Sequence, residues 1–267
     1  MADSVFRSDV LKGKATLVTG GGSGICFGIT RKLMEHGASA VIVGRKADRL
    51  QAAAEELSRV TGGRCIAKPA DVRDAAQIGE AADAAVSAFG SLDILVNGAA
   101  GNFLSPASQL SPNGFRTVMD IDACGTFNAS KAAFDKWMRD HGGNIINISA
   151  TLHYGATPMQ IHASAAKAAV DSITRTLAAE WAGLGVRVNG IAPGPIDDTE
   201  GMSRLAPGDM KAKFISRIPI RRYGTIDEIA NVAVFLASDA ASLIHGATIV
   251  ADGAAWLGMG MRMDDLG

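Results

Sequence analysis

Short apolar runs alternate with longer amphipathic stretches along most of the chain, and this alternation predicts an α/β fold. The runs have the length and composition of buried strands, whereas the stretches between them repeat apolar residues at helical spacing. Strands are expected at residues 15–19, 40–44, 65–70, 92–97, 144–149, 186–192 and 247–252. Because parallel strands need helical crossovers, the pattern predicts a doubly wound, parallel, seven-stranded sheet with helices on both faces.

Three helix starts carry recognisable capping residues. Asp74 with Gln77 resembles a capping box, and so does Thr225 with Glu228. The segment 111–134 begins with Ser-Pro, a pair typical of an N-cap and first helical turn, and predicts one long helix.

One stretch, residues 195–219, lacks clear periodicity and is rich in Gly, Pro, Asp and Arg. It follows the sixth strand, at the carboxyl edge where ligands bind in such sheets. An ordinary solvated loop is the alternative, but the length of the stretch favours a lid. No repeat or linker divides the chain, so residues 1–267 are expected to form a single domain.

Composition and charge narrow the classes of function. With 48% hydrophobic residues the chain can form a full core. Lys+Arg is 26 and Asp+Glu is 27, so the basic excess of nucleic-acid-binding proteins is missing. An anionic ligand must therefore be held by local arginines.

The three cysteines include no CxxC pair, and neither a disulfide framework nor a metal site is expected from them. The longest uncharged stretch is broken by Gly, Asn, Ser and Pro, which argues against a membrane span. We expect a cytoplasmic protein without membrane or nucleic-acid partners.

A glycine-rich turn follows the first strand and opens a helix. Glycines let the backbone approach a pyrophosphate, and a helix N-terminus offers free N–H groups and a positive dipole. A tight structural turn is the alternative, but the strand–turn–helix context predicts a Rossmann-type dinucleotide site. The residues expected to bind the cofactor are Gly20, Gly22, Ser23, Gly24 and Ile25.

The second strand ends in Gly44, followed by Arg45, Lys46 and, one turn later, Arg49. A site for NAD needs an acidic residue here for the ribose 2′-hydroxyl. Basic residues instead suit a 2′-phosphate, although they could simply be solvated. We therefore expect NADPH as the cofactor, with Arg45 and Arg49 at its phosphate.

Four motifs occur in the order seen in short-chain dehydrogenases/reductases, which the chain resembles over about residues 10–255. They are Thr19-Gly20…Gly24-Ile25, Ala70-Asp71-Val72, Asn97-Gly98-Ala99-Ala100-Gly101 and Pro193-Gly194-Pro195. The resemblance implies that Asp71 and Val72 lie at the adenine, and Asn97 at the nicotinamide end of the fourth strand. It also implies that Pro193, Gly194 and Ile196 border the nicotinamide. Cys26 replaces the last glycine of the family's TGxxxGIG motif.

The family's usual catalytic hydroxyls are missing. Ordinary members place a Tyr four residues before a Lys and a Ser thirteen residues before that Tyr. Lys167 fits the Lys, but Ala163 and Ala150 stand at the other two positions. Two hypotheses remain: a reductase that delivers its proton differently, or an inactive NADP-binding scaffold that contacts partners through the helix around 172–183.

Several further segments resemble 2,4-dienoyl-CoA reductases of the peroxisomal type. They are residues 99–103, 117–122, 125–128, 150–152, 162–167 and 193–196. The mitochondrial type has a proton-donating Tyr where this chain has Leu152, and an Asn where it has Cys124. The peroxisomal type has an Asp that matches Asp122.

This resemblance implies NADPH-dependent reduction of 2,4-dienoyl-CoA to 3-enoyl-CoA, in the degradation of unsaturated fatty acids. The reaction adds a hydride to the far carbon of the diene and a proton to the α-carbon, while the thioester oxygen carries the charge. Asp122 and Lys167 are expected to orient a donor water between them, and Lys167 also to bind the nicotinamide ribose. A reductase of another acyl-thioester or enone is the alternative.

The resemblance also implies substrate contacts and assembly. Phe103 is a candidate for the acyl channel, and Arg73 and Arg204 match arginines that contact the CoA portion. Further candidates for the substrate site are Ser111 and Asn113. A homotetramer is expected.

Two more polar residues near the site have ordinary expected roles. We expect His162 to satisfy a hydrogen bond rather than to catalyse. Tyr154 is expected to be a pocket wall, in an extended segment two residues past the mitochondrial-type position.

Overall fold

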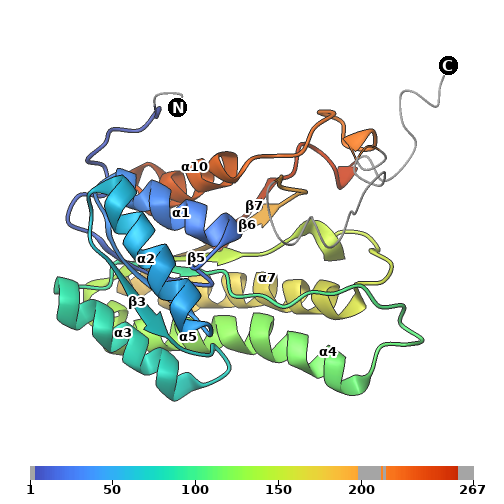
Figure 1. Ribbon diagram of the computed structural model, residues 1–267, viewed down its shortest axis with the longest axis horizontal. Coiled ribbons are helices and arrows are strands. Elements are labelled where there is room, and N and C mark those ends of the chain that lie inside the picture. The colour runs from blue at the N-terminus through green and yellow to red at the C-terminus, as the bar shows by residue number, and fades with distance from the viewer. Residues whose placement is uncertain (1–3, 198–211, 213–214, 258–267) are drawn as a thin grey trace.

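Seven parallel strands form one sheet in the computed structural model, which describes residues 4–197, 212 and 215–257 (Figure 1). Their order across the sheet is β3-β2-β1-β4-β5-β6-β7. The strands are β1 (Ala15–Thr19), β2 (Ser39–Gly44), β3 (Cys65–Pro69), β4 (Ile94–Asn97), β5 (Gly143–Ile148), β6 (Val186–Pro193) and β7 (Thr248–Ala251). The predicted doubly wound sheet is confirmed.

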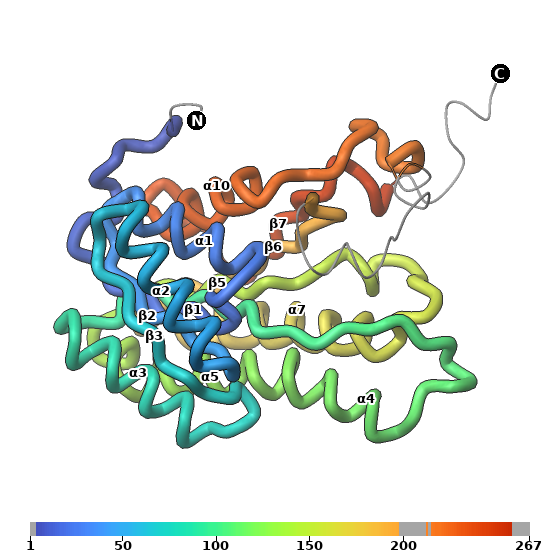
Figure 2. Tube along the Cα trace, in the orientation of Figure 1, coloured from blue at the N-terminus to red at the C-terminus, as the bar shows by residue number. Residues whose placement is uncertain are grey.

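Helices cover both faces of the sheet (Figures 1 and 2). One face carries α1 (Gly24–Glu35), α2 (Ala47–Thr61) and α10 (Ile226–Ala237). The other carries α3 (Ala75–Phe89), α5 (Gly125–Ala133) and α7 (Ile161–Trp181), with α4 (Pro112–Met119) beside α7. Shorter elements are α6 (Arg139–His141), the π-helical η1 (Asp120–Cys124) and η2 (Phe134–Met138), and the 3₁₀ turns η3 (Thr151–His153), η4 (Ala182–Leu184) and η5 (Asp239–Ala241).

The central strands are buried on both faces, so their side chains alternate between two cores. Val18, Val96 and Ile146 pack with the α1 side. Leu17 and Leu95, one position earlier on their strands, pack with the α3 side. This explains why the strands appear in the sequence as continuous apolar runs.

Two of the expected caps are confirmed. The Thr225 hydroxyl accepts a hydrogen bond from the backbone N–H of Glu228, whose carboxylate accepts from the N–H of Thr225, which completes a capping box. Ser111 Oγ accepts from Gly114 N at 3.0 Å and starts α4. The expected helix over 111–134 then runs on to His141 through the two π-helical segments.

Only one of the two hydrogen bonds of the capping box expected at Asp74 is present. Asp74 does cap α3, since its side chain accepts from the N–H groups of Ala76 and Gln77. Gln77 Oε1, however, accepts from the backbone N–H of Asp71 at 3.0 Å, not from Asp74. The glutamine thus fixes the turn between β3 and α3, while its Nε2 donates to the side chain of the N-cap residue at Oδ2 at 2.9 Å.

Most of the expected lid, residues 195–219, lies outside the described residues, namely 198–211 and 213–214. The lid and the single domain over 1–267 stay predictions. No described helix is long and apolar enough to cross a membrane.

Candidate active site

A row of polar residues lies at the carboxyl ends of three neighbouring strands, where Thr19 pairs with Asn97 and Asn97 with Asn147. Asn97 Nδ2 donates to Ser130 Oγ at 3.0 Å and to Asn147 Oδ1 at 2.9 Å, and all three side chains are buried. Buried polar groups need such partners. Asn97 therefore joins the end of β4 to β5 and α5, beneath the expected nicotinamide site.

The turn after β1 packs against the loop after β4 without room for side chains. A Cβ at Gly20 would lie 2.9 Å from Gly98 O, and φ of Gly20 is +72°, which favours glycine. Thr19 Oγ1 accepts from the N–H groups of Gly98 at 3.0 Å and Ala99 at 3.2 Å. The lack of a side chain at Gly20 thus lets the turn after β1 lie directly against the loop after β4.

The first turn of α1 leaves donors available. Ser23 is the N-cap residue of α1, and its side chain makes no capping hydrogen bond. The first N–H groups of a helix have no partner within the helix, so they can bind an anion. Together with the glycine cradle at 20–22, this fits the pyrophosphate of a dinucleotide, and the helix start includes Gly24 and Ile25 as expected.

Cys26 is a packed, protonated thiol. Its Sγ fills the space beside Gly98, where an added Cβ would lie only 1.9 Å away. Burial raises the pKa of Cys26 to about 12, in spite of the opposing charge of Lys167. The position at a helix N-terminus therefore does not make this cysteine reactive.

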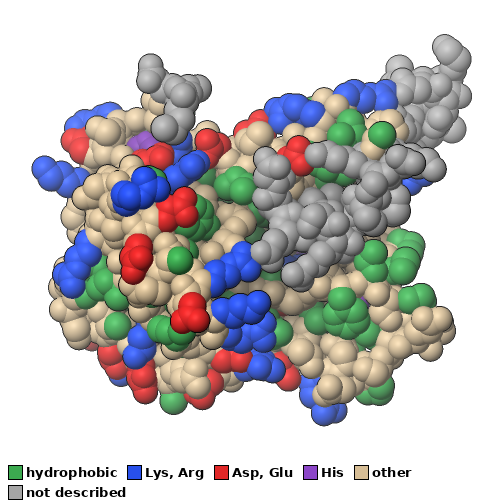
Figure 3. All heavy atoms as spheres, viewed as in Figure 1, with side chains coloured by type: hydrophobic (Ala, Val, Ile, Leu, Met, Phe, Trp, Pro, Cys, Tyr) green, Lys and Arg blue, Asp and Glu red, His purple; other side chains and the backbone are tan. Residues whose placement is uncertain are grey.

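Basic residues follow β2 at the start of α2. Arg45, Lys46 and Arg49 are exposed. Figure 3 shows Lys and Arg side chains gathered near the middle of the face that it presents. Both arginines thus lie on the surface, and their expected role at a 2′-phosphate stays a prediction.

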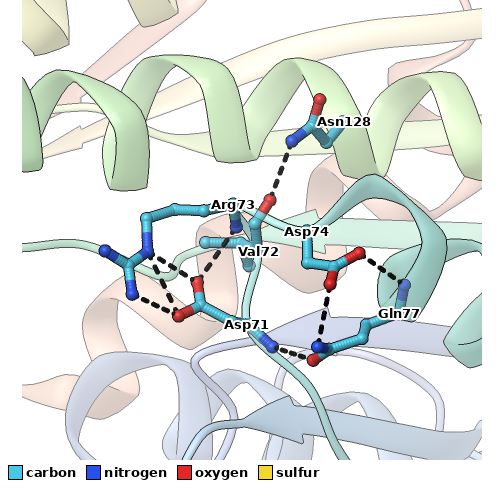
Figure 4. A network of polar contacts seen from close by, with 6 residues as sticks. All are labelled: Asp71, Val72, Arg73, Asp74, Gln77 and Asn128. Atoms are coloured by element: carbon cyan, nitrogen blue, oxygen red, sulfur yellow. Dashed lines mark hydrogen bonds and ion pairs between the residues drawn. The ribbon is translucent and has the colours of Figure 1, made fainter.

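Asp71 and Arg73, expected at the adenine and at CoA, bind one another (Figure 4). Arg73 Nη2 lies 2.6 Å from Asp71 Oδ2, and Arg73 Nε donates to Oδ1 at 3.0 Å. These bonds lower the pKa of Asp71, and the charge of Arg45 also contributes. Their separate contacts with ligands stay predictions.

The two expected catalytic residues meet in a buried ion pair. Lys167 Nζ lies 3.1 Å from Asp122 Oδ2, with 10% and 1% of the side chains exposed. Gly101 N donates to Asp122 Oδ1 at 2.7 Å, and Lys167 Nζ donates to Ile148 O at 3.0 Å. The expected water between the two groups is wrong, because they are in direct contact.

A π-helical segment presents Asp122 to the lysine. In η1 the backbone N–H of Gly125 reaches back to Asp120 O, which widens the turn. Thr126 Oγ1 donates to the Asp122 carbonyl at 2.6 Å and holds the segment. Such widened turns often occur at functional sites.

The loop after β4 is fastened to the start of α7. Asn102 Nδ2 donates to Gln160 Oε1 at 2.7 Å. His162 Nε2 lies 3.0 Å from Phe103 O, and the two rings stack with centroids 4.3 Å apart. The expected hydrogen bond of His162 is confirmed. The Phe103 ring is partly exposed, and its role in an acyl channel stays a prediction.

Tyr154 lies in a turn, so the extended geometry assumed for it is wrong. It follows the 3₁₀ turn η3, and its hydroxyl donates to Asp171 Oδ2 at 3.4 Å. Burial, together with the charge and the hydrogen bond of Asp171, raises the pKa of Tyr154 to about 12. His153 Nε2 lies 2.9 Å from the same carboxylate. Asp171 was missed because a helical Asp one turn after Lys167 carries no motif of its own.

The remaining residues expected at the site lie at the end of β6, on α4 or outside the described part of the chain. Gly194 follows β6, where a Cβ would lie 2.5 Å from Asp252 Cβ, and Ile196 is buried. Ser111 uses its hydroxyl to cap α4, and Asn113 is exposed on that helix. Arg204 lies outside the described residues.

Comparisons with known proteins identify relatives of this chain. A family model described as enoyl-(acyl carrier protein) reductase matches residues 20–254. The peroxisomal 2,4-dienoyl-CoA reductase of Danio rerio is 49% identical over 254 residues, covering 95% of this chain and 85% of the relative. The enzyme of the same name from Arabidopsis thaliana is 49% identical over 265 residues, covering 96% and 88%.

A solved structure is also similar along almost the whole chain. It is a gluconate 5-dehydrogenase from Burkholderia cenocepacia in complex with NADP and tartrate, with a TM-score of 0.86 and 31% identity. The match covers 93% of this chain and 97% of that chain. From the family match, the two relatives and this shared fold, we conclude that the chain belongs to the short-chain dehydrogenase/reductase family.

Proposed function

We propose that this protein reduces 2,4-dienoyl-CoA to 3-enoyl-CoA with NADPH, in the degradation of unsaturated fatty acids. The observation that carries the proposal is the buried Asp122–Lys167 pair at the carboxyl edge of the sheet. Alanines occupy positions 150 and 163, where carbonyl reductases of this family keep Ser and Tyr. Relatives at 49% identity are named for this reaction.

Reductases of this family bind a nicotinamide cofactor, and this chain offers a fitting site. The amides at 20–25 would hold the pyrophosphate, Arg45 and Arg49 the 2′-phosphate, and Asp71 and Val72 the adenine. Pro193, Gly194 and Ile196 would border the nicotinamide. When bound, NADPH supplies the hydride.

Lys167 can hold ligands while it stays paired. An ammonium group has three N–H donors, and here one faces Asp122 and one Ile148 O. The third N–H remains for the nicotinamide ribose or for a water beside the pair. That water would give its proton to the α-carbon as the charge on the thioester oxygen collapses, and Lys167 would return a proton to the resulting hydroxide.

Asp122 is a positioning and electrostatic group in this scheme. Its carboxylate is fixed by the Gly101 N–H on one oxygen and by Lys167 on the other. An ionised carboxylate is an acceptor only, so it holds the ammonium in place and favours its charged form. In this scheme the pair and its water replace the tyrosine that donates the proton in other members of the family.

The substrate contacts, location and assembly complete the proposal. Phe103 would line the acyl channel, Arg73 and Arg204 would contact the CoA portion, and Ser111 and Asn113 would belong to the substrate site. We infer a homotetramer, which light scattering coupled to gel filtration would test. A cytoplasmic location was expected, whereas the eukaryotic relatives are named peroxisomal, so cell fractionation decides the compartment.

Oxidation of NADPH with a panel of thioesters tests the activity. We expect turnover with 2,4-hexadienoyl-CoA and little with crotonyl-CoA or acetoacetyl-CoA. Activity with acetoacetyl-CoA alone would assign the chain to carbonyl reduction, and activity with crotonyl-CoA alone to reduction of another enone. NADPH binding without turnover on any substrate would support the inactive scaffold.

A further inference from the structure

The turn between β3 and α3 is fixed on both sides by polar contacts (Figure 4). Asp71 N donates to Gln77 Oε1 at 3.0 Å on the α3 side. Asn128 Nδ2, from α5, donates to Val72 O at 2.9 Å. The carboxylate of Asp71 is therefore presented from a rigid backbone.

This turn lies beside the basic start of α2. Gly44, the last residue of β2, accepts a backbone hydrogen bond from Ala70 N at 3.1 Å. Arg45 and Asp71 thus leave the sheet from adjacent points on neighbouring strands. Arg45 is exposed and makes no hydrogen bond or ion pair within the described part of the chain.

Arg73 occupies both oxygens of the Asp71 carboxylate. Its Nε donates to Oδ1 at 3.0 Å and to Oδ2 at 3.1 Å, and its Nη2 donates to Oδ2 at 2.6 Å. The backbone N–H of Arg73 adds a further bond to Oδ1 at 3.0 Å. Arg73 Nη1 takes no part, so the pairing does not prevent a contact with CoA.

A free carboxylate at Asp71 would oppose the recognition of a 2′-phosphate. It would attract Arg45 and repel the phosphate, as the acidic residue of NAD-specific sites does near the ribose. We propose that Arg73 neutralises Asp71 and so keeps Arg45 available, which makes Arg73 a specificity-determining residue for NADPH over NADH. The inference rests on the proposed use of NADPH.

The ratio of the dissociation constants of NADH and NADPH tests this role, measured by nicotinamide fluorescence. Arg73→Gln should lower the ratio by up to about fivefold, the upper end of the effect of an exposed charge pair. NADH binding should hardly change, because its 2′-hydroxyl is neutral. Higher salt should shrink the difference, since screening weakens the field of the freed carboxylate.

A double variant and a matched control isolate the charge. Arg73→Gln/Asp71→Asn should restore the ratio, since no carboxylate is left, while any lost adenine contact affects both cofactors equally. Arg7 binds Asp9 with the same two-residue spacing at 2.9 Å, and Arg7→Gln should leave the ratio unchanged. Circular dichroism checks that each variant is folded.

Three results would overturn the inference. The ratio could stay unchanged in Arg73→Gln, both cofactors could weaken equally, or the double variant could fail to recover. If the unmodified protein prefers NADPH, these results leave the proposed function intact. An unmodified protein without that preference would overturn both.

Discussion

Removal of the Asp122 charge should separate catalysis from cofactor binding. Asp122→Asn keeps the shape of the side chain and an oxygen that can accept the Gly101 N–H, but it no longer pairs with Lys167. We expect turnover of 2,4-hexadienoyl-CoA to fall by about 10²–10⁴, the usual contribution of acid–base assistance. NADPH affinity should stay nearly intact, since Lys167 and the glycine turn remain.

The burial of the pair also sets a cost in stability. With Asp122 1% and Lys167 10% exposed, the variant leaves a nearly buried ammonium without its carboxylate. Breaking a buried pair from one side costs about 3–5 kcal/mol. Lys167 keeps its hydrogen bond to Ile148 O and is partly exposed, so the cost should lie at the low end of this range. We therefore expect Asp122→Asn to lower the free energy of unfolding by about 3 kcal/mol. Asp122→Ala should cost about 1 kcal/mol more, because the Gly101 N–H then loses its acceptor.

Three measurements on each variant test this reasoning. Steady-state kinetics give kcat, fluorescence titration gives the NADPH dissociation constant, and urea unfolding gives stability. Asp120→Asn is a matched control in the same π-helical segment outside the pair, and its turnover should be nearly unchanged. Lys167→Ala should lower both turnover and NADPH affinity.

One outcome would refute the assigned role of the carboxylate. If Asp122→Asn lost stability as expected but kept its kcat, the pair would serve the fold and not the reaction. Equal losses in Asp120→Asn would show that the segment, rather than the carboxylate, is needed.

Three further predictions concern the cofactor, the thiol and the alternative proton donor. Arg45→Asp should weaken NADPH binding far more than NADH binding, and equal losses would show that Arg45 does not contact the 2′-phosphate. Because the pKa of Cys26 is raised to about 12, this thiol stays protonated at neutral and mildly alkaline pH; mass spectrometry after iodoacetamide should find the exposed Cys124 labelled and Cys26 unlabelled in the folded protein. Labelling of Cys26 at rates near those of Cys124 would contradict its burial. Tyr154→Phe should change turnover little, because the hydroxyl is directed to Asp171, and a collapse of activity would identify the phenol as the acid.

The layout of the sheet could be predicted because its signals are local. Each central strand is a continuous apolar run, and both core faces follow from the alternation of residues such as Leu17 and Val18. Lys167 and Asp122 were found from motifs, since the spacing around each one resembles a family pattern. Their direct contact could not be predicted from motifs, because it depends on how α7 and η1 pack against one another.

The features that the sequence analysis missed are of two kinds. In some, a side chain can choose between two suitable hydrogen-bond partners, and in others the partners lie far apart in the sequence. Gln77 could have capped α3, but the free N–H of Asp71 offers it a bond at 3.0 Å. No residue pattern in the sequence predicted the π-helical turn around Asp122. This turn lies where the helix packs against α7. Asp171 binds His153 and Tyr154, which lie in a separate loop. The spacing of residues along the chain cannot show such a contact.

The product formed in D₂O tests the central claim most directly. The protein is mixed with NADPH and 2,4-hexadienoyl-CoA, and the product is analysed by NMR after rapid quenching. A sample of 3-hexenoyl-CoA incubated with the protein corrects for later exchange at the α-carbon. We predict 3-hexenoyl-CoA with one solvent deuterium at the α-carbon, since the donor near Asp122 and Lys167 derives its proton from water. A 2-enoyl product without deuterium at the α-carbon, or no product while NADPH is bound, would contradict the account.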